Sequence, residues 1–323
     1  MAKAQAHAHT EAGSRFGQGM FSALRFRDYR LLWTGNFVTQ TGQWMQQVAL
    51  GWLVLDLTGS ATYLGLVGFA RGIPMLFMSL PAGVLADRMD RRKLLLVAQL
   101  VAAALAVILA VLVVTGLVRP WHVLVTSFLS GSAMAFVFPV RQALVPSLVP
   151  REHLANAVAL NSAGQNSTRV LGPSLAGVLI SAIGTAGCFF LQAGSLIWAA
   201  VLSARLPKRP RSNQARTARS NVRDGLRFIA SSPTLTALIG LAAIPTVLAM
   251  PFQQMLPVFA TDVLRTGSTG LGLLMAASGV GALVGSLAYA AVGKVGNEGM
   301  VLIGTAGAFG LALCLFAASS WAP

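Results

Sequence analysis

The sequence predicts an all-α protein, a polytopic bundle of transmembrane helices. Hydrophobic residues make up 55% of the 323 residues and charged residues only 10%, whereas soluble domains carry about 25% charged residues. Mean hydropathy is +0.69. Long apolar stretches recur, each sufficient for the helix of about 20 residues that crosses a bilayer. Spans exposed to lipid must be helical, because every backbone group has to be paired internally.

The apolar stretches predict nine spans in two unequal sets. They cover residues 31–57, 63–86, 94–116, 121–140, 154–183, 188–204, 235–260, 271–292 and 300–318. Four regions follow from them: a tail over 1–30, a six-helix half over 31–204, a basic linker over 205–233 and a partial second half over 234–323. Within the linker, Val222, Leu226 and Ile229 repeat at helical spacing, which predicts a short amphipathic helix on the membrane surface.

The distribution of Lys and Arg predicts a cytoplasmic N-terminus in the cell membrane. Basic residues crowd the tail and the loops after the second, fourth and sixth spans, with Arg141 and Arg151 assigned to the loop after the fourth. The opposite side holds only Arg119 and Arg265. The net charge of +15 therefore comes from basic residues that flank the spans. We expect the lipid bilayer as the partner of these residues and no binding of nucleic acid.

Enzymatic chemistry has no support in the residue pattern. The two cysteines lie within spans and His7 and His9 lie in a polar tail, so no metal-ligand spacing is present. The sequence also lacks a nucleophile paired with a base and a phosphate-binding loop. We expect no cofactor, no metal and no enzymatic activity.

The two parts of the chain look like copies of one another. The sequence around Gln46-Gln47 and the Thr-Gly-Ser turn at 58–60 returns at Gln253-Gln254 and 266–268, an offset of roughly 207 residues. Asp56 is matched by Asp262 in the same order. Parallel repeats joined by a long linker are typical of secondary transporters.

The loop after the second span resembles the signature of the major facilitator superfamily, G-x-x-x-D-R-x-G-R-R/K. It runs from residue 83 to 93 as GVLADRMDRRK. The residues that match, and to which the resemblance assigns a conformational role, are Gly83, Asp87, Arg88, Arg91 and Arg92. Asp90 stands where the second glycine is expected.

The fifth predicted span carries a second motif, RVLGPSLAG over 169–177. It is similar to the glycine-proline motif of superfamily antiporters, which gives Gly172, Pro173 and Gly177 a conformational role. Pro173 removes an intrahelical hydrogen bond and can kink the helix, and the glycines permit close packing. The opening FRDYRLLW over 26–33 resembles the branch that contains the enterobactin exporter and multidrug efflux proteins.

The most important departure from this family, which has twelve helices in two sets of six, is the number of spans. Only three spans follow the linker, so we expect the sequence to be incomplete at its C-terminal end. The alternatives to a working transporter are therefore a truncated remnant that does not transport, and a membrane scaffold or sensor.

Four amides of the first span are candidate substrate contacts. Asn36, Gln40, Gln43 and Gln47 are spaced by four, three and four residues, so they share one helix face. That face must meet protein or a wet cavity, because unpaired amides are costly in lipid. The two interpretations are a substrate cavity, which the resemblance favours, and hydrogen bonds between helices. Gln253 and Gln254 are their repeat equivalents.

Arg71 and Arg169 are buried charges within spans, and such charges indicate function by default. Arg71 lies 16 residues before Asp87, about 24 Å along a helix. We expect both to flank the substrate route, the alternative being a role in packing alone. Asp56 is the best candidate for proton coupling, because no carboxylate lies at mid-membrane. The sequence thus predicts a secondary transporter that exports small amphipathic or anionic compounds, siderophore-like or drug-like, by alternating access.

Overall fold

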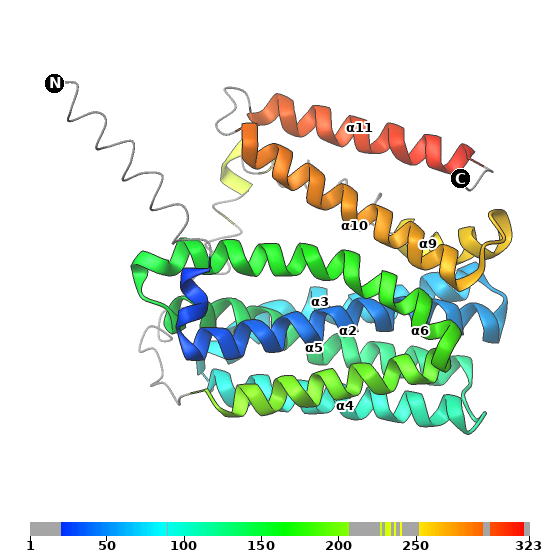
Figure 1. Cartoon of the computed structure of the whole chain (residues 1–323), viewed down its shortest axis with the longest axis horizontal. Coiled ribbons are helices and arrows are strands. Elements are labelled where there is room, and N and C mark those ends of the chain that lie inside the picture. Colours follow the sequence, from blue (N-terminus) through cyan, green and yellow to red (C-terminus); the bar gives the residue numbers. More distant parts are fainter. Residues whose placement is uncertain are drawn as a thin grey trace.

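The computed structural model describes residues 21–88, 90–206, 252–292 and 298–319, with the isolated positions 227, 230–233, 236 and 240. Its helices are α2 (Arg27–Thr58), α3 (Ala61–Arg88), α4 (Arg91–Val114), α5 (Pro120–Leu148), α6 (Leu154–Ala204), α9 (Phe252–Val258), α10 (Gly267–Val292) and α11 (Glu298–Ala318). Short 3-10 turns η1 (Ser22–Arg25) and η2 (Arg151–His153) and a π-helical turn η5 (Phe259–Val263) join them. The described part contains no strand, and the all-α prediction is confirmed (Figure 1).

The described helices coincide with the predicted spans. Helices α2 to α5 are the first four, and α10 and α11 are the eighth and ninth. The fifth and sixth spans form the single element α6, which is broken at Gly184 (φ 71°, ψ 177°). There the chain reverses, so that the second segment of α6 runs back along the bundle (Figure 1). Most of the seventh span, the linker from residue 207 and the predicted amphipathic helix lie outside the described residues.

Four described segments are long and apolar enough to cross a membrane. They cover Arg91–Val114, Pro120–Gln142, Arg151–Ala204 and Gly299–Ala318. Helix α2 has 32 residues but is less apolar, because its amides replace hydrophobic side chains. A span can carry such residues where it faces other helices or a polar route.

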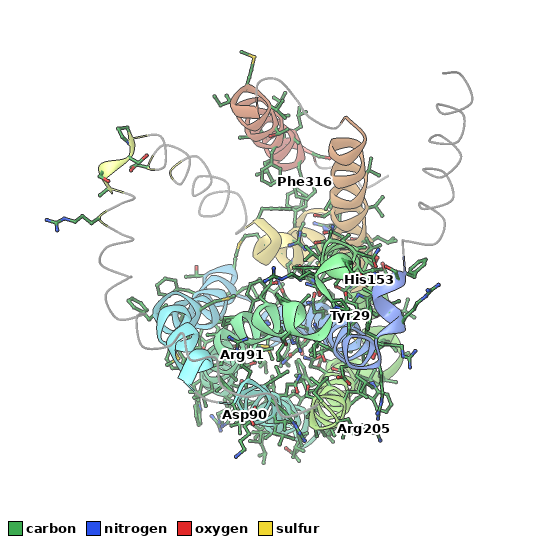
Figure 2. The ribbon with its side chains drawn as sticks, turned by 90° about the vertical axis from the view of Figure 1, so that its left-hand side faces the viewer. Tyr29, Asp90, Arg91, His153, Arg205 and Phe316 are labelled. Atoms are coloured by element: carbon green, nitrogen blue, oxygen red, sulfur yellow. The ribbon has the colours of Figure 1, made fainter. Side chains whose placement is uncertain are left out.

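Two apolar clusters hold the bundle at its opposite ends. The N-terminal face, where α2 begins and α5 ends, contains Tyr29, Leu95 and Val140 among its buried residues. At the far face, where α2 ends, Val48 and Val54 pack with Leu256 and Leu271 of the second half. Figure 2 views the N-terminal face end-on, with Asp90 and Arg205 at the rim of the six-helix half and α10 and α11 above it. Because Leu256 and Leu271 belong to the second half, the apolar cluster at the far face joins the two halves.

The placement of Arg141 in a loop after the fourth span is wrong. Helix α5 continues to Leu148 through two internal prolines, and Arg141 is only 8% exposed. Two of its guanidinium nitrogens, Nε and Nη2, have no hydrogen-bond partner in the described part of the chain. The helix continues because neighbouring helices and local adjustments compensate for prolines within a membrane bundle.

Candidate functional site

Helix α2 packs against the first segment of α6, and hydrogen bonds fix the position of one helix along the other. The Tyr29 hydroxyl donates to the carbonyl of Ala157 at 2.7 Å, and Trp33 Nε1 donates to that of Leu160 at 3.0 Å. One turn further, a β-carbon at Gly164 would lie 3.3 Å from Trp33 Nε1. Aromatic donors of α2 thus satisfy backbone groups of α6, which fixes the side chains that follow along both helices.

The next turns of this pair enclose a small polar cavity. Asn36 and Gln40 of α2 line it together with Asn161 and Gln165 of α6. Its volume is about 10 Å³, room for a single water molecule. Trp33 stacks on Phe37 beside it, with ring centroids 5.4 Å apart. Four amides therefore converge on one point between the helices.

A larger cavity lies further along the contact between α2 and α6, where the two halves of the protein meet. Trp44 and Arg169 line it from the first half, and the second half contributes Leu256, Met275, Ser278, Gly279 and Ala282. The guanidinium carbon of Arg169 lies 5.8 Å from the centre of the Trp44 ring, which is within the range of a cation–π interaction. Arg169 lies about 22 Å along α6 from Leu154, near the middle of the bundle.

Glycines bring the three helices together around this cavity. A β-carbon at Gly172 would clash with Cβ of Trp44 and lie 2.8 Å from the carbonyl oxygen of Thr41. At Gly272 of α10 it would lie 3.0 Å from Gly177 and from the carbonyl oxygen of Pro173. Helix α6 runs without a break through Pro173 and turns at Gly184 instead. The motif at 172–177 is thus the contact surface of α6 with both α2 and α10.

The interface cavity carries one positive charge on largely apolar walls. None of its described lining residues is acidic, and Ser278 is the only hydroxyl among them. A guanidinium in such surroundings attracts an anion, and the indole ring offers a flat apolar surface beside it. The arrangement suits a ligand that is both anionic and partly apolar.

The structure does not bring all predicted contacts to this place. Gln43 and Gln47 are partly buried and line none of the described cavities, while Arg71 lines a separate cavity within the first half. Gln253 and Gln254 belong to α9, but their side chains lie outside the described residues. Asp56 is exposed near the end of α2.

The signature loop is described only in part. Helix α3 ends at Arg88, and the side chains of Gly83 to Arg88 lie outside the described residues. The Asp90 carboxylate caps α4 by accepting a hydrogen bond from the backbone of Arg92 at 3.0 Å. The guanidinium of Arg92 donates to the carbonyl of Ala204 at the end of α6. Asp90 thus has a structural use as an N-cap in the place where the signature has glycine.

Sequence reasoning missed Asn161 and Gln165. The signal was present, because Asn161, Gln165 and Arg169 are spaced by four residues and so share a face of α6. The amides of α2 were recognised by that spacing, whereas the equivalent stripe of α6 was not.

The fold and the comparisons with known proteins place the chain in the major facilitator superfamily. The sequence profile of the transmembrane secretion effectors within that superfamily matches residues 18–322, and the chain belongs to this family. A solved bacterial homologue of the human lysosomal transporter Spinster, in an inward-facing and unoccupied conformation, has the same fold: its TM-score is 0.66 at 14% identity, over 81% of this chain and 62% of that one.

Several relatives are named as transporters or efflux proteins. The staphyloferrin A transporter of Staphylococcus aureus is 32% identical over 51% of this chain and 42% of its own length. The multidrug efflux pump Tap of Mycolicibacterium fortuitum is 28% identical over 84% of this chain and 68% of its own length. Macrolide efflux protein A of Streptococcus pyogenes is 24% identical, with 88% and 71% covered. The chain thus matches between 42% and 71% of the length of these relatives.

Proposed function

We propose that this chain belongs to a secondary active exporter of small amphipathic or anionic compounds that works by alternating access. The observation that carries the proposal is the interface cavity, where Arg169 and Trp44 of the first half face α10 of the second. A site shared between the halves changes shape whenever they move relative to one another. The relatives named for staphyloferrin A and for drugs support the substrate class.

The row of polar side chains between α2 and the first segment of α6 supplies a route to this site. It leads from the amide cavity, nearer the N-terminal face, to Arg169. Beyond Arg169 the far-face cluster packs Leu256, Leu271 and Met275 against the first half. We propose that the N-terminal face lies in the cytoplasm, in keeping with the basic flanks, so that a substrate enters along the amides and leaves through the far face.

The volume of the interface cavity supports a moving site. It measures about 40 Å³, enough for a few water molecules, whereas sites for drug-sized ligands measure about 300–1,000 Å³. A substrate of that size fits only after α10 separates from α6. The glycine contacts at 272 and 279 are the surfaces that would part.

Coupling and conformational roles are assigned as part of the same proposal. Asp56 is proposed to couple export to protons, and Asp87 to stabilise one state of the signature loop. Asp56→Asn should remove the dependence of efflux on a pH gradient. In a full-length version of the protein, Asp87→Asn should slow efflux while membrane insertion stays normal. Unchanged efflux in either variant would refute the corresponding role.

A binding titration tests the proposal. Tryptophan fluorescence of the purified chain is recorded with an anionic fluorescein-type carboxylate and with a cationic ethidium-type dye. Arg169→Gln should weaken binding of the anion by about tenfold or more, since a charged hydrogen bond contributes roughly 1.5–3 kcal/mol, and should leave the cation unaffected. Arg151→Gln removes the same charge from an exposed turn and should change neither. Equal weakening by both variants would refute a site at Arg169.

A further inference from the structure

A second charged cavity lies wholly within the first half, away from the interface. Arg71 of α3 lines it together with Gln46 of α2 and Thr126, Ser127 and Ser130 of α5. The apolar side of the cavity comes from Leu50 of α2 and from Leu105, Ala106 and Leu109 of α4. No residue of the second half lines it among the described residues. The cavity is therefore distinct from the site at Arg169.

Close packing fixes Arg71 at this level. A β-carbon at Gly131 of α5 would clash with the carbonyl oxygen of Arg71 and lie 3.1 Å from its carbonyl carbon. The absence of a side chain at Gly131 thus lets α3 and α5 touch where Arg71 emerges. Arg71 lies ten residues from the start of α3, about 15 Å along the helix, so its charge lies well inside the helix bundle.

The sequence offers this arginine no carboxylate. Helices α4 and α5 contain no aspartate or glutamate, and the only one in α3 is Asp87, about 24 Å away along the helix. In α2 the nearest to Gln46 is Asp56, ten residues or about 15 Å further on. A charge without a partner in a bilayer costs several kcal/mol. A counterion from solution would remove most of that cost.

A buried hydroxyl beside Arg71 points to the same conclusion. Ser127 is 4% exposed, and its Oγ has no hydrogen-bond partner in the described structure. The neighbouring Thr126 hydroxyl is different, because it donates to the carbonyl of His122 at 2.8 Å. Buried polar atoms are normally satisfied, so an orphan hydroxyl on a cavity wall indicates an occupant. The cavity, of about 10 Å³, has room for one water molecule or one monatomic ion.

We infer that this cavity binds a small monovalent anion, chloride being the abundant candidate. The Arg71 guanidinium neutralises its charge, while the Ser127 and Ser130 hydroxyls and the Gln46 amide donate hydrogen bonds to it. A water molecule would satisfy Ser127 but would leave the guanidinium charge unpaired. An organic substrate is too large for the cavity. The anion is thus a resident counterion that binds α2, α3 and α5 together, and the inference does not depend on the transport function.

The test compares chloride with gluconate, which is too large to enter, at constant ionic strength. The melting temperature of the purified chain should rise with chloride along a saturable curve, by about 3 °C at high occupancy. Radiolabelled chloride should bind with a stoichiometry near one per chain. Arg71→Gln should abolish both effects. Identical melting curves in chloride and gluconate, with no chloride bound, would overturn the inference and leave water as the occupant.

A milder variant covers the case in which Arg71→Gln fails to fold. Ser127→Ala removes only the orphan hydroxyl and should raise the half-saturating chloride concentration about tenfold. Ser132→Ala is the matched control on the same helix, since its hydroxyl donates to the carbonyl of Phe128 at 2.9 Å and does not line the cavity. Equal chloride affinity in both serine variants would contradict the proposed site.

Discussion

The contact between α6 and α10 predicts that one added methyl group separates the two halves. A β-carbon at Gly279 would lie 2.9 Å from the carbonyl oxygen of Arg169 and 3.0 Å from its carbonyl carbon. Comfortable contacts between carbon atoms begin at about 3.5 Å, so α10 has to retreat by about half an ångström. Cγ2 of Val170 would also lie 2.9 Å away, and the backbone of Arg169 cannot rotate out of the way. Gly279→Ala should therefore destabilise the closed contact by about 1–3 kcal/mol, a five- to 150-fold shift in the equilibrium.

Gly281 provides a matched control two residues further along α10. A β-carbon there meets no atom within 4 Å, so Gly281→Ala gains only helix propensity, at most about 1 kcal/mol. Spin labels at the exposed positions Val178 of α6 and Leu273 of α10 would report the separation. Gly279→Ala should increase the fraction of molecules with a longer distance between the two spin labels, and Gly281→Ala should not. Identical distance distributions in the two variants would refute the proposed contact.

Three further predictions concern the first half and its orientation. Asp90→Ala should lower the free energy of unfolding by about 1 kcal/mol through loss of the α4 cap. Asp90→Ser should retain most of that stability. Equal melting temperatures of the parent chain and Asp90→Ala would show that the cap contributes nothing. Tyr29→Phe should cost about 1 kcal/mol, since it leaves the Ala157 carbonyl without its donor, and an unchanged denaturation midpoint would contradict this. A cysteine at Ser212, in the predicted cytoplasmic linker, should react in intact cells only with a permeant maleimide, and labelling by an impermeant one would reverse the topology.

The sequence predicted the spans because hydropathy and length alone determine them in a bilayer. The internal repeat stays a prediction; at its equivalent glycines, Gly59 follows α2 and Gly267 begins α10, with positive φ values of 58° and 69°. Left-handed backbone of this kind favours glycine. A local pattern was sufficient there because the turn is made by adjacent residues.

The site was harder to predict because it depends on which helices meet. Arg71 and Arg169 look alike in sequence, but Arg71 shares a cavity with three other helices of the first half, whereas Arg169 faces α10 of the second half. Arg141 looks like a loop residue because it is a charge just after the predicted span over 121–140, yet the helix continues past it. Hydropathy does not specify which helix faces pack together. A single amino-acid sequence therefore does not show that Arg71 and Arg169 line separate cavities.

The most direct measurement of where a substrate binds is photoaffinity labelling with an anionic probe, followed by peptide mapping. The proposed site predicts that labelled positions cluster around Trp44, Arg169 and Ser278, on three helices that are distant in sequence. An excess of the unmodified anion should protect all three regions together, and Arg169→Gln should abolish their labelling. Labelling confined to other helices, or labelling at these positions that the competitor does not reduce, would contradict a substrate site between the two halves.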